Sequence, residues 1–278
     1  MTNGEVRMTS RPIGVFDSGI GGLTVVRAIR SRLPSESISY FGDTARLPYG
    51  TKSAETITRF AFEDADFLVR RGVKVIVVAC HSAASVALEK LCARLAVPVL
   101  GVIEPGARAL VAATRTGRVA VIGTNATINS GAYERAIRAL ARDIEIVAKP
   151  TPLFVCLAEE GWLDNEVALA VAQRYLSGLA DEGVDAVLLG CTHFPLLSGV
   201  IAKVLGPAVR LVDPGSATAA SVERLLREQG LLAQGAPATS GTMRCYLSDL
   251  VPNFQLVATR FLGEPLAEVL KADLANDQ

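Results

Sequence analysis

Short apolar runs rich in valine and isoleucine recur along the chain from residue 12 onward, and longer amphipathic stretches separate them. Each run is nearly continuous in apolar character, which is typical of strands buried on both faces. The strand-like runs cover residues 13–16, 37–41, 73–79, 97–102, 118–123, 144–148, 184–189 and 209–212. The helix-like stretches cover residues 54–71, 83–95, 133–142, 166–182 and 217–230. This alternation predicts an α/β fold of parallel sheets covered by helices.

Two distant segments resemble each other, GVKVIVVAC at 72–80 and GVDAVLLGC at 183–191. In each, Gly-Val opens a strand, a cysteine comes eight residues after the glycine, and a histidine follows within two positions. A weaker similarity links IGVFDS at 13–18 with VAVIGT at 119–124. Two similar α/β halves joined near residues 104–106 are the simplest explanation, although buried parallel strands also resemble one another by chance. Residues 1–10 are polar and lack periodicity, so we expect a loose tail.

Composition excludes several classes of protein. Half of the 278 residues are hydrophobic and a fifth are charged, which excludes an intrinsically disordered chain. Lys and Arg number 28, as do Asp and Glu, and no basic stripe stands out, so we expect no nucleic-acid partner. No apolar run approaches the roughly 20 residues of a membrane span, and no secretory signal opens the chain. The sequence therefore predicts a soluble cytoplasmic protein without a membrane partner.

Two of the five cysteines are candidates for chemistry. Cys80 and Cys191 each stand at the carboxyl end of a buried strand, where the ligand crevice of an open α/β sheet lies. A helix follows each of them, and the positive end of a helix favours a thiolate. The chain has only two histidines, and these are His81 and His193, beside the two cysteines. The remaining cysteines are expected to be small core residues. They are Cys92, Cys156 and Cys245.

Four kinds of chemistry use such thiols. The spacing of Cys80-His81 and Cys191-Thr192-His193 is unlike that of zinc ligands, so we expect no metal. Thiol–disulfide enzymes usually draw both cysteines from one C-x-x-C turn, and a single nucleophile leaves the second half unexplained. The remaining option is two-base chemistry, in which one thiolate removes a proton from a carbon and a facing thiol returns one to the opposite face.

Other segments suit a small anionic amino acid. The stretch DSGIGG at 17–22 follows a strand and opens a helix, so its backbone N–H groups can receive a carboxylate. It does not fit the dinucleotide fingerprint. Asp17 is placed either to orient or deprotonate a thiol or to cap the helix. The turn-rich loop 42–50 is either part of the site or a plain surface loop, and Thr124 and Thr127 offer hydroxyls at a helix start.

These residues carry a resemblance to a known family. FDSGIGGL, GDTARLPYG, VVAC, GTNATINSGAY and GCTHFPLL, in this order, resemble the glutamate racemases of the aspartate/glutamate racemase superfamily. The match runs from about residue 12 to beyond residue 215. The resemblance implies two pseudo-symmetric α/β domains with the active site in the cleft between them. It divides the chain into 11–104 with 215–270, and 105–214.

The resemblance also implies an activity and a set of site residues. It implies cofactor-independent interconversion of L- and D-glutamate for peptidoglycan synthesis, and a homodimer. Cys80 takes the α-proton from D-glutamate and Cys191 takes it from L-glutamate. Asp17 assists the first thiol, and His193 with Glu159 assists the second. The implied substrate contacts are Asp17, Ser18, Pro48, Tyr49, Gly50, His81, Ser82, Thr124, Thr127, Thr192 and His193.

One position departs from the family pattern. The family reads Cys-Asn-Thr-Ala-Ser at its first cysteine, whereas this chain reads Cys-His-Ser-Ala-Ala from Cys80. A protonated His81 would favour the Cys80 thiolate and attract a substrate carboxylate, or the bulky ring would crowd the site. Two alternatives to glutamate racemisation follow. The chain acts on another acidic amino acid such as aspartate, or it is a binding or regulatory protein on a racemase scaffold, for example one acting on DNA gyrase.

Overall fold

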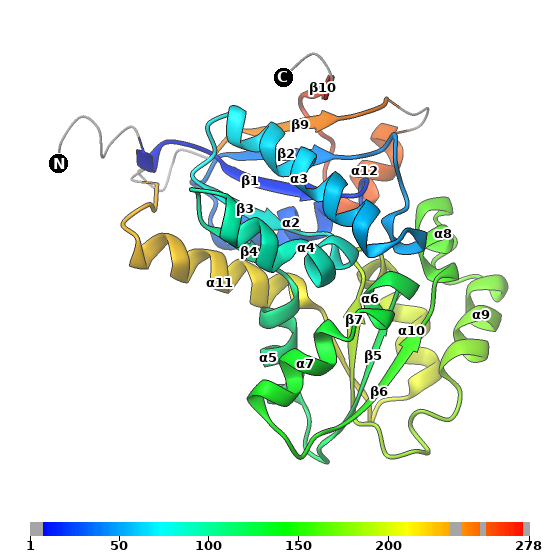
Figure 1. The fold of residues 1–278 in the computed structure, drawn as a ribbon. Coiled ribbons are helices and arrows are strands. Elements are labelled where there is room, and N and C mark those ends of the chain that lie inside the picture. Colours follow the sequence, from blue (N-terminus) through cyan, green and yellow to red (C-terminus); the bar gives the residue numbers. More distant parts are fainter. Residues whose placement is uncertain (1–7, 234–240, 251–253, 275–278) are drawn as a thin grey trace.

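The computed structural model describes residues 8–233, 241–250 and 254–274, and within them ten strands form two separate sheets (Figure 1). The first sheet has the order β10-β9-β2-β1-β3-β4 and the second the order β6-β5-β7-β8. Every pairing is parallel. The bounds are β1 Ile13–Asp17, β2 Ile38–Gly42, β3 Val75–Val78, β4 Val99–Gly101, β5 Arg118–Gly123, β6 Glu145–Pro150, β7 Ala186–Gly190, β8 Arg210–Val212, β9 Met243–Leu247 and β10 Val269–Lys271.

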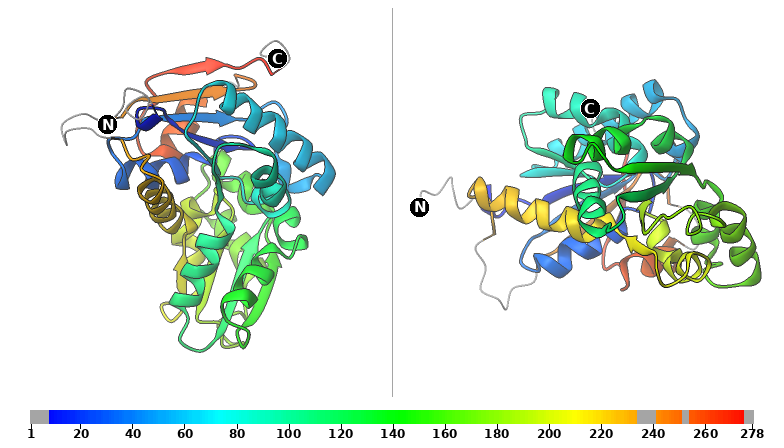
Figure 2. Two further views of the ribbon diagram at one scale, coloured as in Figure 1. Left: turned by 60° about the vertical axis from the view of Figure 1, so that its left-hand side comes forward. Right: turned by 90° about the horizontal axis from the view of Figure 1, so that it is seen from below.

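Helices cover both faces of each sheet, as Figures 1 and 2 show. On the first sheet α3 and α4 pack together on one face, and α2 packs with α11 and α12 on the other. The helices are α2 Leu23–Arg32, α3 Ala54–Arg70, α4 His81–Arg94, α5 Ile103–Ala113, α6 Asn125–Asn129, α7 Ala132–Leu140, α8 Leu153–Glu160, α9 Glu166–Leu176, α10 Ser198–Leu205, α11 Pro214–Glu228 and α12 Phe254–Leu262, with short 3₁₀ turns η1 Tyr49–Thr51 and η2 Phe194–Leu197. The predicted α/β class is confirmed.

The central strands explain why the apolar runs predicted them. Every residue of β1, β2, β3 and β7 is buried, because helices cover both faces. The sequence did not predict β9 and β10, which lie at one edge of the first sheet. Neither strand has a continuous apolar run, since β9 includes the exposed Arg244 and most of the edge strand β10 is exposed. The predicted helix at 166–182 ends early, at Leu176, and Gly178 then takes a left-handed conformation at φ +90°.

The chain passes between the sheets twice. It leaves the first sheet after β4 through α5 and returns through α11, which packs against both α2 and α5. Strand β9 then pairs with β2, so the last part of the described chain joins the first sheet. We call the first sheet with α2, α3, α4 and α12 the first lobe, and the second sheet with α6 to α10 the second lobe.

The predicted N-terminal tail is only partly described. Residues 1–7 lie outside the described residues, whereas Thr9 is buried and its carbonyl accepts a hydrogen bond from Lys74 Nζ at 2.8 Å. The same ammonium pairs with the buried Glu36. The end of the predicted tail is therefore fixed to the first lobe. Among the helices of the described residues, none is long and apolar enough to cross a membrane.

Candidate active site

The two candidate thiols lie at matching positions of the two sheets. Cys80 follows β3 and stands directly before α4, whereas Cys191 follows β7 directly. Both side chains are almost fully buried, and both line one narrow cavity with a volume of about 30 Å³. The parallel strands bring their carboxyl ends to this point, as open α/β sheets do.

The cavity collects most of the predicted site residues. It is lined by Ser18, Gly19, Leu47, Pro48, Tyr49, Gly50, Cys80, His81, Ser82, Thr124, Val155, Glu159, Cys191, Thr192 and His193. Asp17 and Thr127 do not line it, although each contacts residues that do. The lining residues absent from the predicted set are Gly19, Leu47 and Val155. Gly19 and Leu47 lie within the segments 17–22 and 42–50 that the sequence singles out, whereas no local signal marks Val155.

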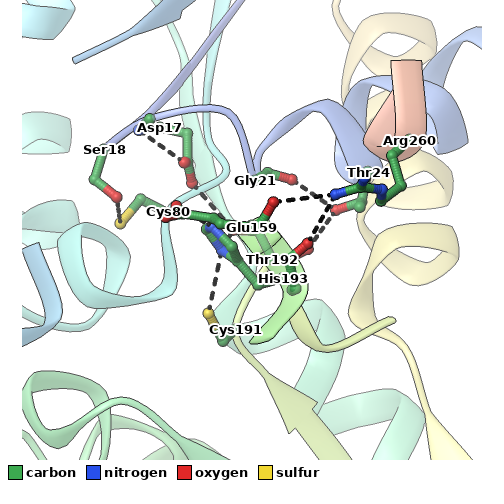
Figure 3. Close-up of polar contacts among 12 residues, drawn as sticks. Asp17, Ser18, Gly21, Thr24, Cys80, Glu159, Cys191, Thr192, His193 and Arg260 are labelled. Atoms are coloured by element: carbon green, nitrogen blue, oxygen red, sulfur yellow. Dashed lines mark hydrogen bonds and ion pairs between the residues drawn. The ribbon is translucent and has the colours of Figure 1, made fainter. Parts of the chain in front are cut away.

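A carboxyl group and a hydroxyl group surround the first thiol (Figure 3). Cys80 Sγ lies 3.6 Å from Ser18 Oγ, and Asp17 is 1% exposed at the end of β1. Burial raises the pKa of the Cys80 thiol to about 12, the negative charge of Asp17 adds to this, and N–H groups of Ala83 and Ser18 oppose it. The helix start therefore does not yield a thiolate at neutral pH in the ligand-free protein, because desolvation outweighs it.

Asp17 is held by the glycine run. Its Oδ2 accepts the Gly19 N–H at 3.0 Å, so that N–H is not directed at a ligand carboxylate. The Asp17 carboxylate also accepts a hydrogen bond from the backbone N–H of Gly22, the residue that precedes α2. Burial raises the pKa of Asp17, while the positive charge of His193 and backbone N–H groups oppose this rise. Asp17 thus has an elevated pKa next to the Cys80 thiol.

An imidazole and a carboxylate stand beside the second thiol. His193 Nδ1 lies 3.7 Å from Cys191 Sγ, and His193 Nε2 lies 3.0 Å from Glu159 Oε1 of α8 (Figure 3). Burial alone would lower the pKa of His193, but its hydrogen bonds to Cys191 and Glu159 raise it to about 10. The ring is therefore an imidazolium at neutral pH. It donates one N–H to the carboxylate and directs the other at the sulfur.

Thr192 links the two sides of the site. Its hydroxyl lies 3.4 Å from Asp17 Oδ1 and 3.4 Å from His193 Nδ1. Its carbonyl accepts the Thr24 hydroxyl of α2 at 3.0 Å, a partner that sequence reasoning missed. Gly21 is required at this junction, because a Cβ there would lie 2.3 Å from Thr192 Oγ1 and 2.5 Å from the His193 ring.

Three hydroxyl groups form a cluster across the lobes. Ser82 Oγ of α4 lies 2.9 Å from Thr124 Oγ1 and 3.4 Å from Thr127 Oγ1, and the two threonine hydroxyls are 3.1 Å apart. Thr124 also caps α6 by accepting the Thr127 N–H. Gly50 allows close approach here, because a Cβ would lie 2.6 Å from Thr124 Cβ. The cluster offers hydroxyl donors and a helix start to an anionic group.

Tyr49 is fixed by a buried carboxyl pair. Its hydroxyl donates to Asp64 Oδ2 at 2.8 Å and also bonds Asp43. Arg46 forms ion pairs with both carboxylates. Residues 47–50 of the predicted loop therefore line the cavity, and the phenol of Tyr49 is anchored in the first lobe.

His81 is buried in the cavity wall without a polar partner. Neither ring nitrogen has a hydrogen-bond partner, and its ring lies edge-on to Tyr133 with 6.0 Å between centroids. Burial lowers the pKa of His81 to about 3, and the nearby charge of His193 contributes. The alternative of a protonated His81 is therefore wrong, because desolvation keeps the ring neutral.

The other cysteines divide by burial. Cys245 is buried as expected, whereas Cys92 and Cys156 are exposed, so the core prediction is wrong for those two. They lie on outward faces of α4 and α8. Among the described residues, no three His, Cys, Asp or Glu side chains are grouped to hold a metal ion.

Two α/β lobes that each contribute a buried thiol to a shared cavity define an isomerase of the racemase class. The family model described as Asp/Glu/Hydantoin racemase matches residues 23–222. The chain belongs to this family.

Individual relatives make the similarity specific. A glutamate racemase of Geobacter metallireducens is 51% identical over 98% of this chain and 100% of its own length. One from Neisseria meningitidis is 46% identical over 93% of this chain and 95% of its own length. The structure of Francisella tularensis glutamate racemase in complex with D-glutamate superposes with a TM-score of 0.89 at 39% identity, covering 96% of this chain and 99% of that one. The predicted resemblance is confirmed, and the chain is an amino-acid racemase.

Proposed function

We propose that this chain interconverts L- and D-glutamate without a cofactor, with Cys80 and Cys191 transferring protons to and from opposite faces of the α-carbon. The observation that carries the proposal is the pair of buried thiols at one cavity, each with its own acid–base partner. The similarity to glutamate racemases over nearly the whole chain, including one solved with D-glutamate, supports glutamate as the substrate.

The reaction consists of two proton transfers. For L-glutamate, the Cys191 thiolate takes the α-proton, and the C–H electron pair stays on the α-carbon as a carbanion. The Cys80 thiol then gives its proton to the opposite face, which yields D-glutamate and a Cys80 thiolate. The reverse reaction exchanges the roles. The protonated state of Cys80 in the ligand-free protein suits this order, since its pKa is raised to about 12.

Each thiol is served by its neighbours. Asp17 accepts the Cys80 proton when D-glutamate is the substrate, because its own raised pKa makes it a stronger base than an ordinary carboxylate. His193, held by Glu159, exchanges a proton with Cys191. Both partners are buried, so their protons reach the sulfurs without passing through bulk water.

The α-proton of an amino acid is far less acidic than a thiol, so the site must stabilise the developing carbanion. The hydroxyl cluster of Ser82, Thr124 and Thr127 supplies donors for the α-carboxylate, in a cavity that holds little water. Further substrate contacts come from the remaining lining residues. They are Ser18, Pro48, Tyr49, Gly50, His81, Thr192 and His193.

We extend the proposal to the setting of the enzyme. The domains comprise 11–104 with 215–270, and 105–214. We expect a homodimer in the cytoplasm that supplies D-glutamate for peptidoglycan.

Isotope exchange tests the proposal. Incubation with L- or D-glutamate in D₂O, followed by NMR of the α-proton and by polarimetry, should show exchange and racemisation from both enantiomers without added cofactor. Cys80→Ser and Cys191→Ser should each lose racemisation by at least about a thousandfold, while Cys92→Ser, at an exposed thiol, should keep it. Full racemisation in either active-site variant would overturn the mechanism. Exchange with aspartate but not glutamate would move the substrate, and no exchange with any acid would favour a binding protein.

A further inference from the structure

The helix α12 contacts both members of the pair that serves the second thiol. Arg260 Nη1 donates to the Glu159 carbonyl at 3.0 Å and approaches the Ala158 carbonyl at 3.5 Å (Figure 3). The next residue, Phe261, is fully buried and lies edge-on to the His193 ring, with 5.1 Å between centroids. Two consecutive residues of one helix therefore touch Glu159 and His193.

The end of α8 is built to receive this guanidinium. The last carbonyls of a helix lack partners within it, and a cation near them is favourable. Gly161, which follows α8, takes the left-handed conformation at φ +78°, and a Cβ there would lie 2.5 Å from Arg260 Cζ. Glycine at this position thus provides both the turn and the space for Arg260.

This contact crosses between the lobes. Helix α12 packs on α2 of the first lobe, whereas α8 belongs to the second. Glu159 is the next-to-last residue of α8, and its side chain is about one-third exposed and bonds His193. The backbone at the end of α8 consequently decides where that carboxylate lies.

We propose that Arg260 is a positioning residue for the second thiol. It holds the end of α8 so that Glu159 keeps its hydrogen bond to His193, which in turn faces Cys191. This inference rests on the proposed function for its catalytic meaning, although the geometry it describes can be tested without substrate. Helix α12 of the first lobe must then pack against the end of α8 for Glu159 and His193 of the second lobe to form their hydrogen bond.

The titration of His193 distinguishes positioning from simple electrostatics. The ionisable groups that face this ring are Cys191, Glu159, Asp17 and His81. Loss of a nearby cation without movement of Glu159 would raise the pKa of His193, because one repulsion disappears. Loss of the Glu159 hydrogen bond would lower it. The two roles of Arg260 therefore predict shifts of opposite sign.

The experiment is NMR of protein labelled with ¹³C at the histidine ring, titrated from pH 5 to 11. The chain has only two histidines, and His81 should stay neutral throughout, which makes the spectrum simple to assign. We expect Arg260→Met to lower the pKa of His193 by about one unit and to lower kcat roughly tenfold with little change in KM. Arg260→Lys should recover part of both effects. Arg108→Met is the matched control, because Arg108 is exposed and pairs with Glu104 of its own helix.

An unchanged or raised pKa of His193 in Arg260→Met would overturn the proposal, whatever happens to the rate. If that variant does not fold, the pKa in Arg260→Lys decides by the same criterion with a smaller expected shift. Failure of the wild-type protein to racemise glutamate would overturn the proposed function alone, since the titration needs no substrate.

Discussion

Cys80 and Cys191 stand at matching ends of the two sheets, yet their neighbours differ in charge. A buried carboxyl group and a serine hydroxyl accompany Cys80, and burial, with the negative charge of Asp17, raises the pKa of its thiol to about 12. An imidazolium backed by a carboxylate accompanies Cys191. The similar backbones of the two lobes therefore present the same functional group in unlike electrostatic surroundings.

This difference teaches that the symmetry of the reaction does not require symmetric proton partners. The enantiomers have equal free energy in water, so kcat/KM must be equal in the two directions for every variant. Damage to either partner consequently slows both directions alike. What differs is the set of charged and polar groups around each thiol.

The largest effects on the rate are expected from removing Asp17 and His193, the acid–base partners of the two thiols, one at a time. Asp17→Asn and His193→Gln should each lower kcat/KM by about 10²- to 10⁴-fold, the usual contribution of a positioned acid or base. Steady-state rates with both enantiomers, measured from pH 6 to 10, check this. If either variant keeps more than about half of the wild-type rate, the assignment of a separate partner to each thiol is wrong.

Alkylation compares the thiols without any substrate. At pH 8 the Cys80 thiol should react with iodoacetamide at least roughly a hundredfold more slowly than the exposed Cys92, because burial and Asp17 keep it protonated. Asp17→Asn should speed the reaction at Cys80. It should leave Cys245 unchanged, since burial alone raises the pKa of that thiol to about 12. Mass spectrometry of tryptic peptides gives the rates, and equal acceleration at both cysteines would show that the variant merely loosens the fold.

The local sequence pattern predicted the buried strands and the two cysteines that follow them. Continuous apolar runs mark the buried strands, and the cysteines directly after them end at the cavity by the geometry of parallel sheets. The neutral state of His81 could not be predicted, because burial depends on the whole fold. Arg260 was missed for a related reason, since its contacts lie about a hundred residues away in the sequence. Glu159 came only from the family resemblance.

Two glycine-to-alanine variants, one at the junction of the lobes and one at an open position, test the close packing between the lobes. Gly21→Ala should push Thr192 and His193 away from Asp17, destabilise the protein by about 1–3 kcal/mol and lower kcat roughly tenfold. Gly199→Ala is the control, because nothing lies within 4 Å of a Cβ there and alanine favours its helix. Urea unfolding and rate measurements on both variants test this. Wild-type behaviour of Gly21→Ala would mean that the junction at Thr192 adapts freely.

The smallest expected effect is on the pH dependence of stability, and it separates the two sides by pH window. The folded pKa of His193, about 10, lies above its unfolded value near 6.5, so its stabilisation is complete below pH 6.5 and is lost as the pH rises through 10. The folded pKa of Cys80, about 12, lies above its unfolded value near 9, so its loss of stability begins only above pH 9. The free energy of unfolding from urea titrations should therefore fall less between pH 6.5 and 9 in His193→Gln, by on the order of 1 kcal/mol, and less above pH 9 in Cys80→Ser. A change in the same window for both variants would mean that the two thiols share one proton network through Thr192, and the contrast between their surroundings would then describe a single coupled site.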